Sequence, residues 1–370
     1  MTTGDDMREV RVELGERGYV VRIGPGILAG LGAALRAVLG EGGSSVAAVI
    51  TDENVAPLYG GCAIDSLRRA GYDARLVTVP AGDATKSLAT ASRLYDELAA
   101  ARMERSSPVI ALGGGMVGDL TGFVAATWLR GVPFVQCSTT VEADVDAGVG
   151  GKTGVNHPAG KNLIGAFYQP RLVLMDTATL DTLPDRDFRA GLAESIKHGA
   201  IRDAAFLEWH HRNAHRILAH DAAAVAELLE KNVRIKAEVV AADEREAGLR
   251  AILNFGHTIG HAIETLMDYE WRHGECVAVG MVAASRIAVR RSIMSAADAG
   301  RLRTLLETFG LPTQIPVTIP PDRVIELTKM DKKVAAGKVK FVLVPRFGET
   351  VFRNDITDVE IRQAVEDMKP

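Results

Sequence analysis

Residues 139–170 of this chain read TTVEADVDAGVGGKTGVNHPAGKNLIGAFYQP, and the rest of the sequence can be interpreted outward from this stretch. It follows an apolar run, residues 133–137, that predicts a buried strand. Its glycines argue against a continuous helix and let backbone N–H groups approach a ligand. Two lysines and two asparagines add the cationic and amide donors that hold phosphate. They are Lys152, Lys161, Asn156 and Asn162. The stretch therefore predicts a long functional loop for an anionic substrate or cofactor, in preference to a solvated surface loop.

On either side of this loop, short apolar runs alternate with helical patterns. This alternation predicts an open parallel sheet with helices on both faces, preceded by a hairpin around Gly15–Gly18. In such sheets the ligand binds beyond the carboxyl ends of the strands. The predicted strands are residues 10–14, 19–23, 46–51, 75–79, 108–112, 134–137 and 172–175. The predicted helices are residues 26–39, 58–70, 84–101 and 115–128.

The pattern changes near residues 182–184. Residues 185–310 are rich in Ala, Leu, Glu and Arg and predict helices almost throughout, and four prolines then interrupt the pattern. Residues 340–353 predict a small hairpin around Phe347–Gly348. We therefore expect a Rossmann-like α/β nucleotide-binding domain over residues 1–182. An all-α domain that binds metal and substrate would follow over residues 183–370, with a ligand cleft between the two.

The composition of the 370 residues excludes several classes of protein. A net charge of −4 gives no attraction to nucleic acid or to an anionic membrane, and no apolar run approaches the ~20 residues that span a bilayer. Cys62, Cys137 and Cys276 are far apart and form no CxxC pair, which is typical of reduced thiols. The polar start, MTTGDDMREV, is not a signal peptide. We therefore expect a cytoplasmic protein.

A glycine-rich turn, ALGGGMVGDLTGF at residues 111–123, joins a predicted strand to a predicted helix. A helix N-terminus in this context can receive a pyrophosphate, although its glycines match G-x-G-x-x-G only weakly, and a tight turn without a ligand is the alternative. Asp52 and Asn54 end one earlier strand, and residues 81–86 (AGDATK) end the next. Three polar strand ends in succession favour a dinucleotide cofactor.

Residues 148–153, GVGGKT, match the end of a Walker A loop. Asp146, however, occupies the leading position, where that loop requires glycine, and no helix follows. The sequence therefore disfavours a P-loop NTPase.

The helical half contains candidate metal ligands. His257 and His261 are spaced i and i+4, on one helix face, and His273 lies at the start of a further helix. Glu194, in GLAESIKHG, is an acid in an otherwise apolar helical run. One carboxylate with two histidines and an open position is a common catalytic zinc set. The spacing does not decide which two of the three histidines bind the metal.

Several cations accompany these ligands and favour a substrate with more than one anionic group. Lys197 is one helical turn from Glu194. The others are Lys236, Arg250, Lys332 and Lys333.

Five motifs together resemble the 3-dehydroquinate synthases in order and spacing, over nearly the whole chain. They are GGGMVGD, TT…D…GGKTGVNHPAGKNLIGAFYQP, GLAESIKHG, LNFGHTIGHA and RHGE. The resemblance implies a homodimeric, NAD- and metal-dependent lyase of the shikimate pathway of aromatic amino-acid synthesis. Its reaction would convert 3-deoxy-D-arabino-heptulosonate 7-phosphate to 3-dehydroquinate and phosphate. The cyclases that make deoxy-inosose or valiolone depart from the loop pattern, and aminodehydroquinate synthases differ in the Glu segment.

The resemblance also implies roles for individual residues. The metal, zinc or cobalt, would be bound by Glu194, His257 and His273. The substrate would contact Arg130 (reaching in from a partner subunit), Asp146, Lys152, Asn162, Lys197, Lys236, Arg250, Asn254, His261 and Lys332, the last preferred to Lys333. NAD would lie against Asp52, Asn54, Asp83, Lys86, Gly114, Gly115, Met116, Asp119, Thr139, Thr140, Lys152, Lys161, Thr179 and Thr182.

One segment departs from the family pattern. After Thr140 the family has mostly apolar residues and glutamine, whereas this chain has Glu142 and Asp144. The added acid bears on NAD affinity but removes no catalytic group. Two further hypotheses are a metal-dependent NAD polyol dehydrogenase, which would not need the cation cluster, and a non-catalytic, metal-stabilised nucleotide-binding regulator.

Overall fold

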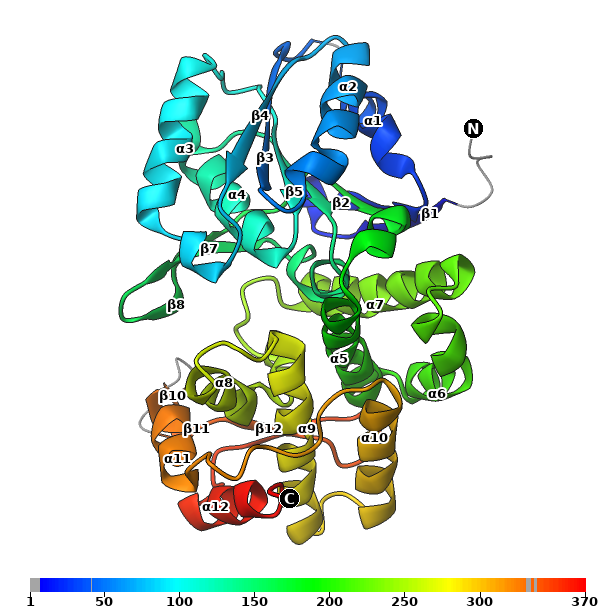
Figure 1. Cartoon of the computed structure of the whole chain (residues 1–370), viewed down its shortest axis with the longest axis vertical. Helices are drawn as coiled ribbons and strands as arrows, with labels where there is room; N and C mark the ends of the chain where they lie inside the picture. Colours follow the sequence, from blue (N-terminus) through cyan, green and yellow to red (C-terminus); the bar gives the residue numbers. More distant parts are fainter. Residues whose placement is uncertain (1–6, 41, 331–333, 336–337) are drawn as a thin grey trace. The chain divides into compact units, whose positions relative to one another are not determined.

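The computed structural model describes residues 7–40, 42–330, 334–335 and 338–370, so the predicted substrate contact Lys332 and its neighbour Lys333 lie outside the described residues. Contacts divide the chain into two units (Figure 1). One contains Met1–Leu183 with Val225–Arg245, and the other contains Pro184–Ala224 with Glu246–Pro370. The expected domain boundary at residues 182–183 stays a prediction, because the first unit also takes up Val225–Arg245 from the second half of the chain.

A seven-stranded sheet forms the centre of the first unit, in the order β1-β2-β9-β6-β5-β3-β4. Only the β1–β2 pair is antiparallel, and the other pairs are parallel. The inner strands are buried almost throughout, which explains why they are continuously apolar in sequence. The strands are β1 (Arg8–Val12), β2 (Tyr19–Gly24), β3 (Val46–Asp52), β4 (Asp73–Val79), β5 (Val109–Gly113), β6 (Phe134–Ser138) and β9 (Leu172–Asp176).

Helices cover both faces of this sheet, as predicted (Figure 1). On one face, α1 (Leu31–Leu39) and α2 (Gly61–Arg69) bury Leu35 and Leu67 in one apolar core. On the other, α3 (Leu88–Ala100) and α4 (Gly115–Thr127) bury Leu94 and Leu120 in a second core. The α/β fold class is therefore confirmed, and its strands lie within about two residues of the predicted runs.

Residues 139–170 are more ordered than the expected loop. A π-helical turn, η6 (Ala143–Ala147), is followed by an antiparallel hairpin of β7 (Lys152–His157) and β8 (Gly160–Phe167). The prediction of an irregular loop was wrong for these strands. Glycine, lysine and asparagine dilute the period-two pattern, so the pairing of Val155 with Ile164 does not stand out in the sequence.

The second unit is mainly helical, as expected. The predicted hairpin near its end is present as β12 (Phe341–Leu343) and β13 (Val351–Arg353). Helices α11 and α12 were not predicted. The helices are α5 (Asp185–Arg202), α6 (Ala204–Leu218), α8 (His257–Leu266), α9 (His273–Arg290), α10 (Ala296–Thr308), α11 (Pro321–Met330) and α12 (Asp358–Glu366), with the 3₁₀ turn η8 (Leu249–Asn254) and the short pair β10 (Val334–Ala335) and β11 (Lys338–Val339).

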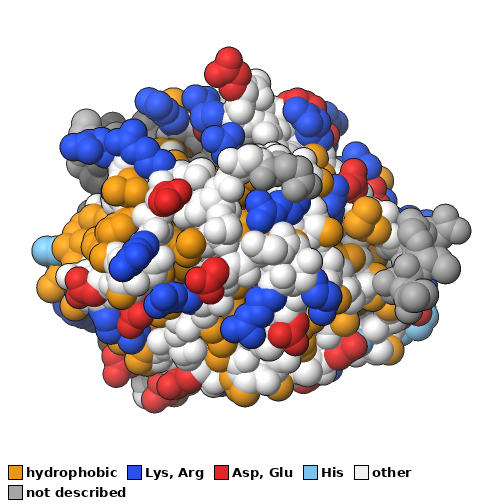
Figure 2. All heavy atoms as spheres, turned by 90° about the horizontal axis from the view of Figure 1, so that it is seen from above, with side chains coloured by type: hydrophobic (Ala, Val, Ile, Leu, Met, Phe, Trp, Pro, Cys, Tyr) orange, Lys and Arg blue, Asp and Glu red, His pale blue; other side chains and the backbone are white. Residues whose placement is uncertain are grey.

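Helix α7 (Ala222–Ala242) belongs largely to the first unit. Within the described residues, no helix is long and apolar enough to cross a membrane. On the face shown in Figure 2, the described Lys and Arg side chains are mixed with Asp and Glu and do not form one continuous basic surface.

Helices α8 and α9 pack with their backbones nearly in contact. A Cβ atom added at Gly280 would lie 1.9 Å from the carbonyl oxygen of Gly256, and one at Gly260 would lie 2.8 Å from that of Cys276. Gly274 is equally tight, since its Cβ would lie 1.8 Å from the carbonyl oxygen of Ala190 in α5. Only glycine permits these approaches, so the glycines determine how closely the three helices lie.

We therefore predict that Gly280→Ala destabilises the protein by about 1–3 kcal/mol or more, because the added methyl group must displace backbone. Gly300→Ala is the matched control. Gly300 lies in α10 with nothing within 4 Å of an added Cβ, and its replacement should stabilise the protein by about 0.5–1 kcal/mol. The urea midpoints of both variants test this prediction. Equal midpoints would contradict the backbone contact.

Candidate active site

Three imidazoles and one carboxylate converge in the second unit. The rings of His257 and His261 from α8 and of His273 from α9 each place one nitrogen within 4.8 Å of the other two. The carboxylate comes from Glu194 in α5, whose Oε1 lies 3.5 Å from His257 Nε2 and 3.8 Å from His273 Nε2. The structure therefore brings together the predicted ligands Glu194, His257 and His273.

The second nitrogen of two of these rings faces a hydrogen-bond acceptor. His257 Nδ1 lies 3.2 Å from the carbonyl oxygen of Phe255, and His273 Nδ1 lies 3.3 Å from Oε2 of Glu264. Because a carbonyl or carboxylate oxygen can only accept, each Nδ1 carries the proton. Each Nε2 then directs its lone pair to the side of Glu194. This is the usual arrangement of metal-ligating histidines, and both His257 and His273 show it.

Glu194 is fully buried, and its Oε1 has no hydrogen-bond partner among the described residues. Its other oxygen accepts a hydrogen bond from Lys197, which is also buried. A buried carboxylate oxygen without a donor is costly unless a cation compensates it. The oxygen, facing two imidazole Nε2 atoms, therefore fits a divalent cation such as zinc.

Neighbouring contacts hold the helices that carry these ligands. Glu275 accepts a hydrogen bond from the backbone N–H of Arg272 at 2.8 Å, and it pairs with Arg186 of α5 at 2.7 and 2.8 Å. These bonds hold the first turn of α9, where His273 lies. Next to Glu194, Ser195 Oγ lies 2.7 Å from Nε2 of the buried His210 in α6, which anchors α5.

The second unit also contains the predicted substrate contacts Lys197, Arg250, Asn254 and His261. Arg250 is 1% exposed, in η8 directly before the histidine helix. Asn254 donates its side-chain amide to Glu246 at 3.1 Å. Glu246 and Glu264 were missed by the sequence analysis. Glu264 had a readable signal, because HTIGHAIE spaces His257, His261 and Glu264 at i, i+4 and i+7.

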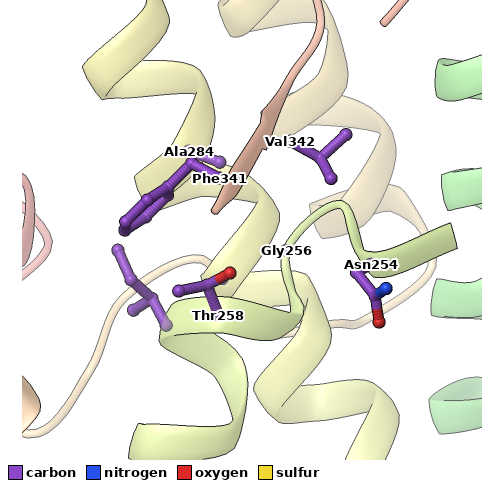
Figure 3. Close-up of a pocket in the computed structure, with 8 residues that line it drawn as sticks. Asn254, Gly256, Thr258, Ala284, Phe341 and Val342 are labelled. Atoms are coloured by element: carbon purple, nitrogen blue, oxygen red, sulfur yellow. The ribbon is translucent and has the colours of Figure 1, made fainter. Parts of the chain in front are cut away.

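A small pocket, too narrow to hold a water molecule, lies beside Asn254 and the turn at Gly256 (Figure 3). Phe341 and Val342 of β12 and Ala284 of α9 make most of its wall apolar. Thr258 and Asn254 are the polar side chains among its described lining residues. The remaining lining residues are Ile259 and Gly280.

The first unit contains the predicted pair Asp146 and Lys236. Asp146 lies in η6, and Lys236 lies in the part of α7 that belongs to this unit. Lys236 Nζ donates to Asp146 Oδ1 at 2.5 Å and also to its carbonyl oxygen. The Lys236 side chain is 4% exposed and that of Asp146 is 31% exposed, so the lysine end of the ion pair is shielded from water.

The three remaining described substrate contacts are exposed side chains of the same unit. Lys152 begins β7 and is exposed, and Asn162 in β8 has a left-handed backbone with φ of 52°. Arg130 is exposed with φ of 68°, and Leu129 before it has φ of 48°. Two adjacent non-glycine residues in this region store strain of roughly 1–3 kcal/mol each, which is typical of functional segments.

The predicted cofactor residues gather at the carboxyl ends of the strands. β5 lies beside β3 although β4 separates them in sequence, and a dinucleotide binds at such a switch point. Gly114 precedes α4 at the end of β5, so backbone N–H groups and a helix N-terminus are available there. Thr139 and Thr140 follow β6, and Met116 and Gly115 open α4.

Asp83 is the centre of the polar contacts at this edge. It accepts the side-chain amide of Asn156 at 2.9 Å and lies 3.4 Å from Lys161 and 3.6 Å from Lys86. Lys86 is buried and pairs with Asp119 at 3.0 Å. Four of the five residues are predicted cofactor contacts, and the structure brings them together.

Three other predicted cofactor contacts are engaged locally. Asp52 Oδ1 accepts the backbone N–H groups of Asn54 and Val55 at 2.9 and 3.0 Å, so this oxygen caps the turn after β3. The buried Thr179 donates its hydroxyl to the Asp176 carbonyl at 2.8 Å. The Thr182 hydroxyl lies 2.7 Å from the Tyr59 hydroxyl. Asn54 and Thr182 are exposed, so both can face a ligand.

Comparison with known proteins identifies the family to which this chain belongs. A family model described as 3-dehydroquinate synthase N-terminal matches residues 76–190, and one described as 3-dehydroquinate synthase C-terminal matches residues 191–334. The chain is 49% identical over 362 residues to a 3-dehydroquinate synthase from Symbiobacterium thermophilum, covering 97% of this chain and 100% of the relative. It is 47% identical over 357 residues to a 3-dehydroquinate synthase from Desulforamulus reducens, covering 96% and 98%.

Among solved structures, it is similar to a 2-epi-5-epi-valiolone synthase from Streptomyces hygroscopicus with NAD+ and Zn2+ bound. The TM-score is 0.86 and the identity is 28%, over 95% of this chain and 96% of that one. The two family models together cover more than half of the chain. The chain therefore belongs to the 3-dehydroquinate synthase family of enzymes.

Proposed function

We propose that this chain converts 3-deoxy-D-arabino-heptulosonate 7-phosphate to 3-dehydroquinate and phosphate, with NAD+ and a divalent metal, in aromatic amino-acid synthesis. The observation that supports this proposal most strongly is the buried Glu194 oxygen that faces two imidazole nitrogens. Buried Lys197 and Arg250 in the same unit suit a substrate that carries a carboxylate and a phosphate.

The metal is held by Glu194, His257 and His273. When bound, it polarises a substrate hydroxyl and stabilises negative charge on that oxygen. Zinc is the metal we favour, because the relative with the valiolone activity was solved with Zn2+ and the ligands are two nitrogens and one oxygen. Lys197, bonded to the other oxygen of Glu194, orients that carboxylate and addresses the substrate hydroxyls.

NAD+ would be held at the carboxyl edge of the sheet by the glycine turn before α4 and the residues around Asp83. When bound, it accepts and returns one hydride, so no net NADH forms. The relative with the valiolone activity was solved with NAD+ bound. Lys86 and Lys161 supply positive charge beside Asp83, which suits a pyrophosphate and its ribose.

The remaining residues bind the anionic groups of the substrate. Lys236, Arg250 and Asn254 hold its carboxylate end, and Asp146 holds a hydroxyl. The phosphate is held by Lys152, Asn162, His261 and Arg130. Because that phosphate can itself take up a proton as it leaves, the elimination requires no separate protein base.

The active form is a homodimer in which Arg130 reaches the phosphate of the partner subunit. This part of the proposal is supported by the exposure of Arg130 and by its left-handed backbone conformation, which is costly in free energy and typical of functional segments.

The first prediction concerns turnover by purified protein with the heptulosonate phosphate, zinc and sub-stoichiometric NAD+. Free phosphate should exceed the NAD+ present many times over, while absorbance at 340 nm shows no net NADH. Chelation of the metal should abolish phosphate release, and added zinc should restore it. NADH that accumulates without phosphate would instead indicate the polyol dehydrogenase. No turnover with this substrate, but turnover with its aminated analogue, would indicate an aminodehydroquinate synthase.

A second prediction concerns Lys236. Replacement of Lys236 by Met removes a shielded charge and its ion pair with Asp146, so we expect kcat/KM to fall by about 100-fold or more. Lys231→Met, in the same helix, is the control, because Lys231 is 38% exposed and pairs with Glu227 at the surface. Its kcat/KM should remain within about twofold. Full activity of Lys236→Met would exclude the assigned role.

Asp144, one of the two acidic residues that depart from the family pattern, is buried. Asp144 is 1% exposed and accepts a hydrogen bond from Ser138 at the end of β6, so it faces the protein interior. Its pKa is raised to about 7, mainly by burial; the bond from Ser138 opposes this shift, and nearby Asp176 adds to it. The carboxyl group is therefore largely neutral below that pH.

A third prediction follows from this pKa. A carboxyl group whose pKa is higher in the folded protein than in the unfolded protein prefers to stay protonated in the fold. The protein therefore loses stability as pH rises from the unfolded pKa near 4 to the folded pKa of about 7. Asp144→Asn should therefore gain stability relative to the parent across this window, by roughly 4 kcal/mol at most above pH 7. Exposed Asp96→Asn in α3 should show no such trend. Urea unfolding at pH 4, 5.5 and 8 tests this, and a difference that stays constant with pH would contradict it.

A further inference from the structure

Glu264 is a buried carboxylate that the proposed reaction does not use. It lies in α8 and is 8% exposed, two turns beyond His257 on the same helical stripe as His261. Its Oε2 lies 3.3 Å from Nδ1 of His273, which belongs to the next helix. Helix α8 therefore carries His257, a ligand of the proposed metal site, and Glu264, which contacts the proposed ligand His273 on α9.

The two nitrogens of His273 face two different carboxylates. Nδ1 faces Glu264 at 3.3 Å, and Nε2 faces Glu194 at 3.8 Å. Because a carboxylate only accepts, Glu264 holds the proton on Nδ1 and leaves the lone pair on Nε2. The negative charge of Glu264 also makes the imidazole a stronger donor to a cation.

His257 also carries its proton on Nδ1, but through a different contact. Its Nδ1 faces the backbone oxygen of Phe255, which no side-chain substitution removes. The tautomer of His273, in contrast, depends on a side chain and can be changed by one mutation.

We propose that Glu264 is a positioning residue that sets the tautomer and ring orientation of His273 and thereby the affinity of this chain for its divalent metal. The inference rests on the proposed ligand set Glu194, His257 and His273. Glu264 is not a member of that ligand set.

The helix packing makes such a contact effective. Gly260 lies one turn before Glu264, and its close approach to the backbone of Cys276 holds α8 against the first turn of α9. The distance between Glu264 and His273 is therefore set by the backbone, so a shorter side chain cannot recover the contact by a helix shift.

Three variants of the full chain test this inference by metal binding rather than turnover. Glu264→Ala removes the acceptor, Glu264→Gln keeps an acceptor without the charge, and Glu270→Gln neutralises a nearby exposed carboxylate as the control. Zinc dissociation constants come from competition with a chromophoric chelator. The visible spectrum of the Co2+-substituted protein reports the ligand geometry.

We expect zinc affinity to fall by about 10- to 100-fold in Glu264→Ala and by less in Glu264→Gln, with no change in Glu270→Gln. The Co2+ spectrum of Glu264→Ala should shift, and that of Glu264→Gln should stay closer to the parent spectrum. If Glu264 had only a structural role, its replacement would lower stability, but zinc affinity would not be higher in Glu264→Gln than in Glu264→Ala.

The possible failures are distinguishable. If the parent binds zinc and Glu264→Ala binds it equally tightly with an unchanged Co2+ spectrum, the positioning role is wrong while the proposed function stands. If the parent binds no zinc at this site, the ligand set and the proposed function fail together. If Glu264→Ala does not fold, Glu264→Gln decides, and parental affinity in that variant would overturn the role of the charge.

Discussion

The charge of Glu194 constrains everything around it. A fully buried carboxylate with one oxygen bonded to Lys197 and the other facing two imidazoles is tolerable only where cations are supplied. Lys197 is one of these cations. The other would be the proposed metal, bound between Glu194 Oε1 and the two imidazole Nε2 atoms. The helices α5, α8 and α9 must therefore meet at one point, and the glycines that let their backbones approach are the structural condition for that meeting.

Much of this organisation can be read in the sequence, for physical reasons. Buried parallel strands such as β3 and β5 are continuously apolar, and helix-spaced His257 and His261 share a face by geometry alone. The role of the third histidine could not be read in this way. The proposed choice of His257 and His273 rests on what their Nδ1 atoms face, and those partners are a backbone carbonyl and a side chain on another helix.

Other features stayed hidden because tertiary contacts decide them. The hairpin β7–β8 is built from residues with weak strand preference, and its register is set by pairing with itself. Asp144, which the sequence presents as extra acid in a cofactor loop, turns inward to Ser138. The family resemblance identified Lys236 as a site residue, but its contact with Asp146 joins positions 90 residues apart and no local pattern indicates it.

The path of the chain between the two units has a consequence for how this enzyme can be divided. Because Val225–Arg245 returns to the first unit, the chain passes from one unit to the other three times, and neither unit is a single uninterrupted segment. A fragment that ends at Leu183 would lack Lys236 and with it the cation of Asp146, while the complementary fragment would carry a helix whose apolar face belongs elsewhere. Recombination at one crossover point could not exchange either unit intact, so the two halves of the catalytic machinery are inherited together.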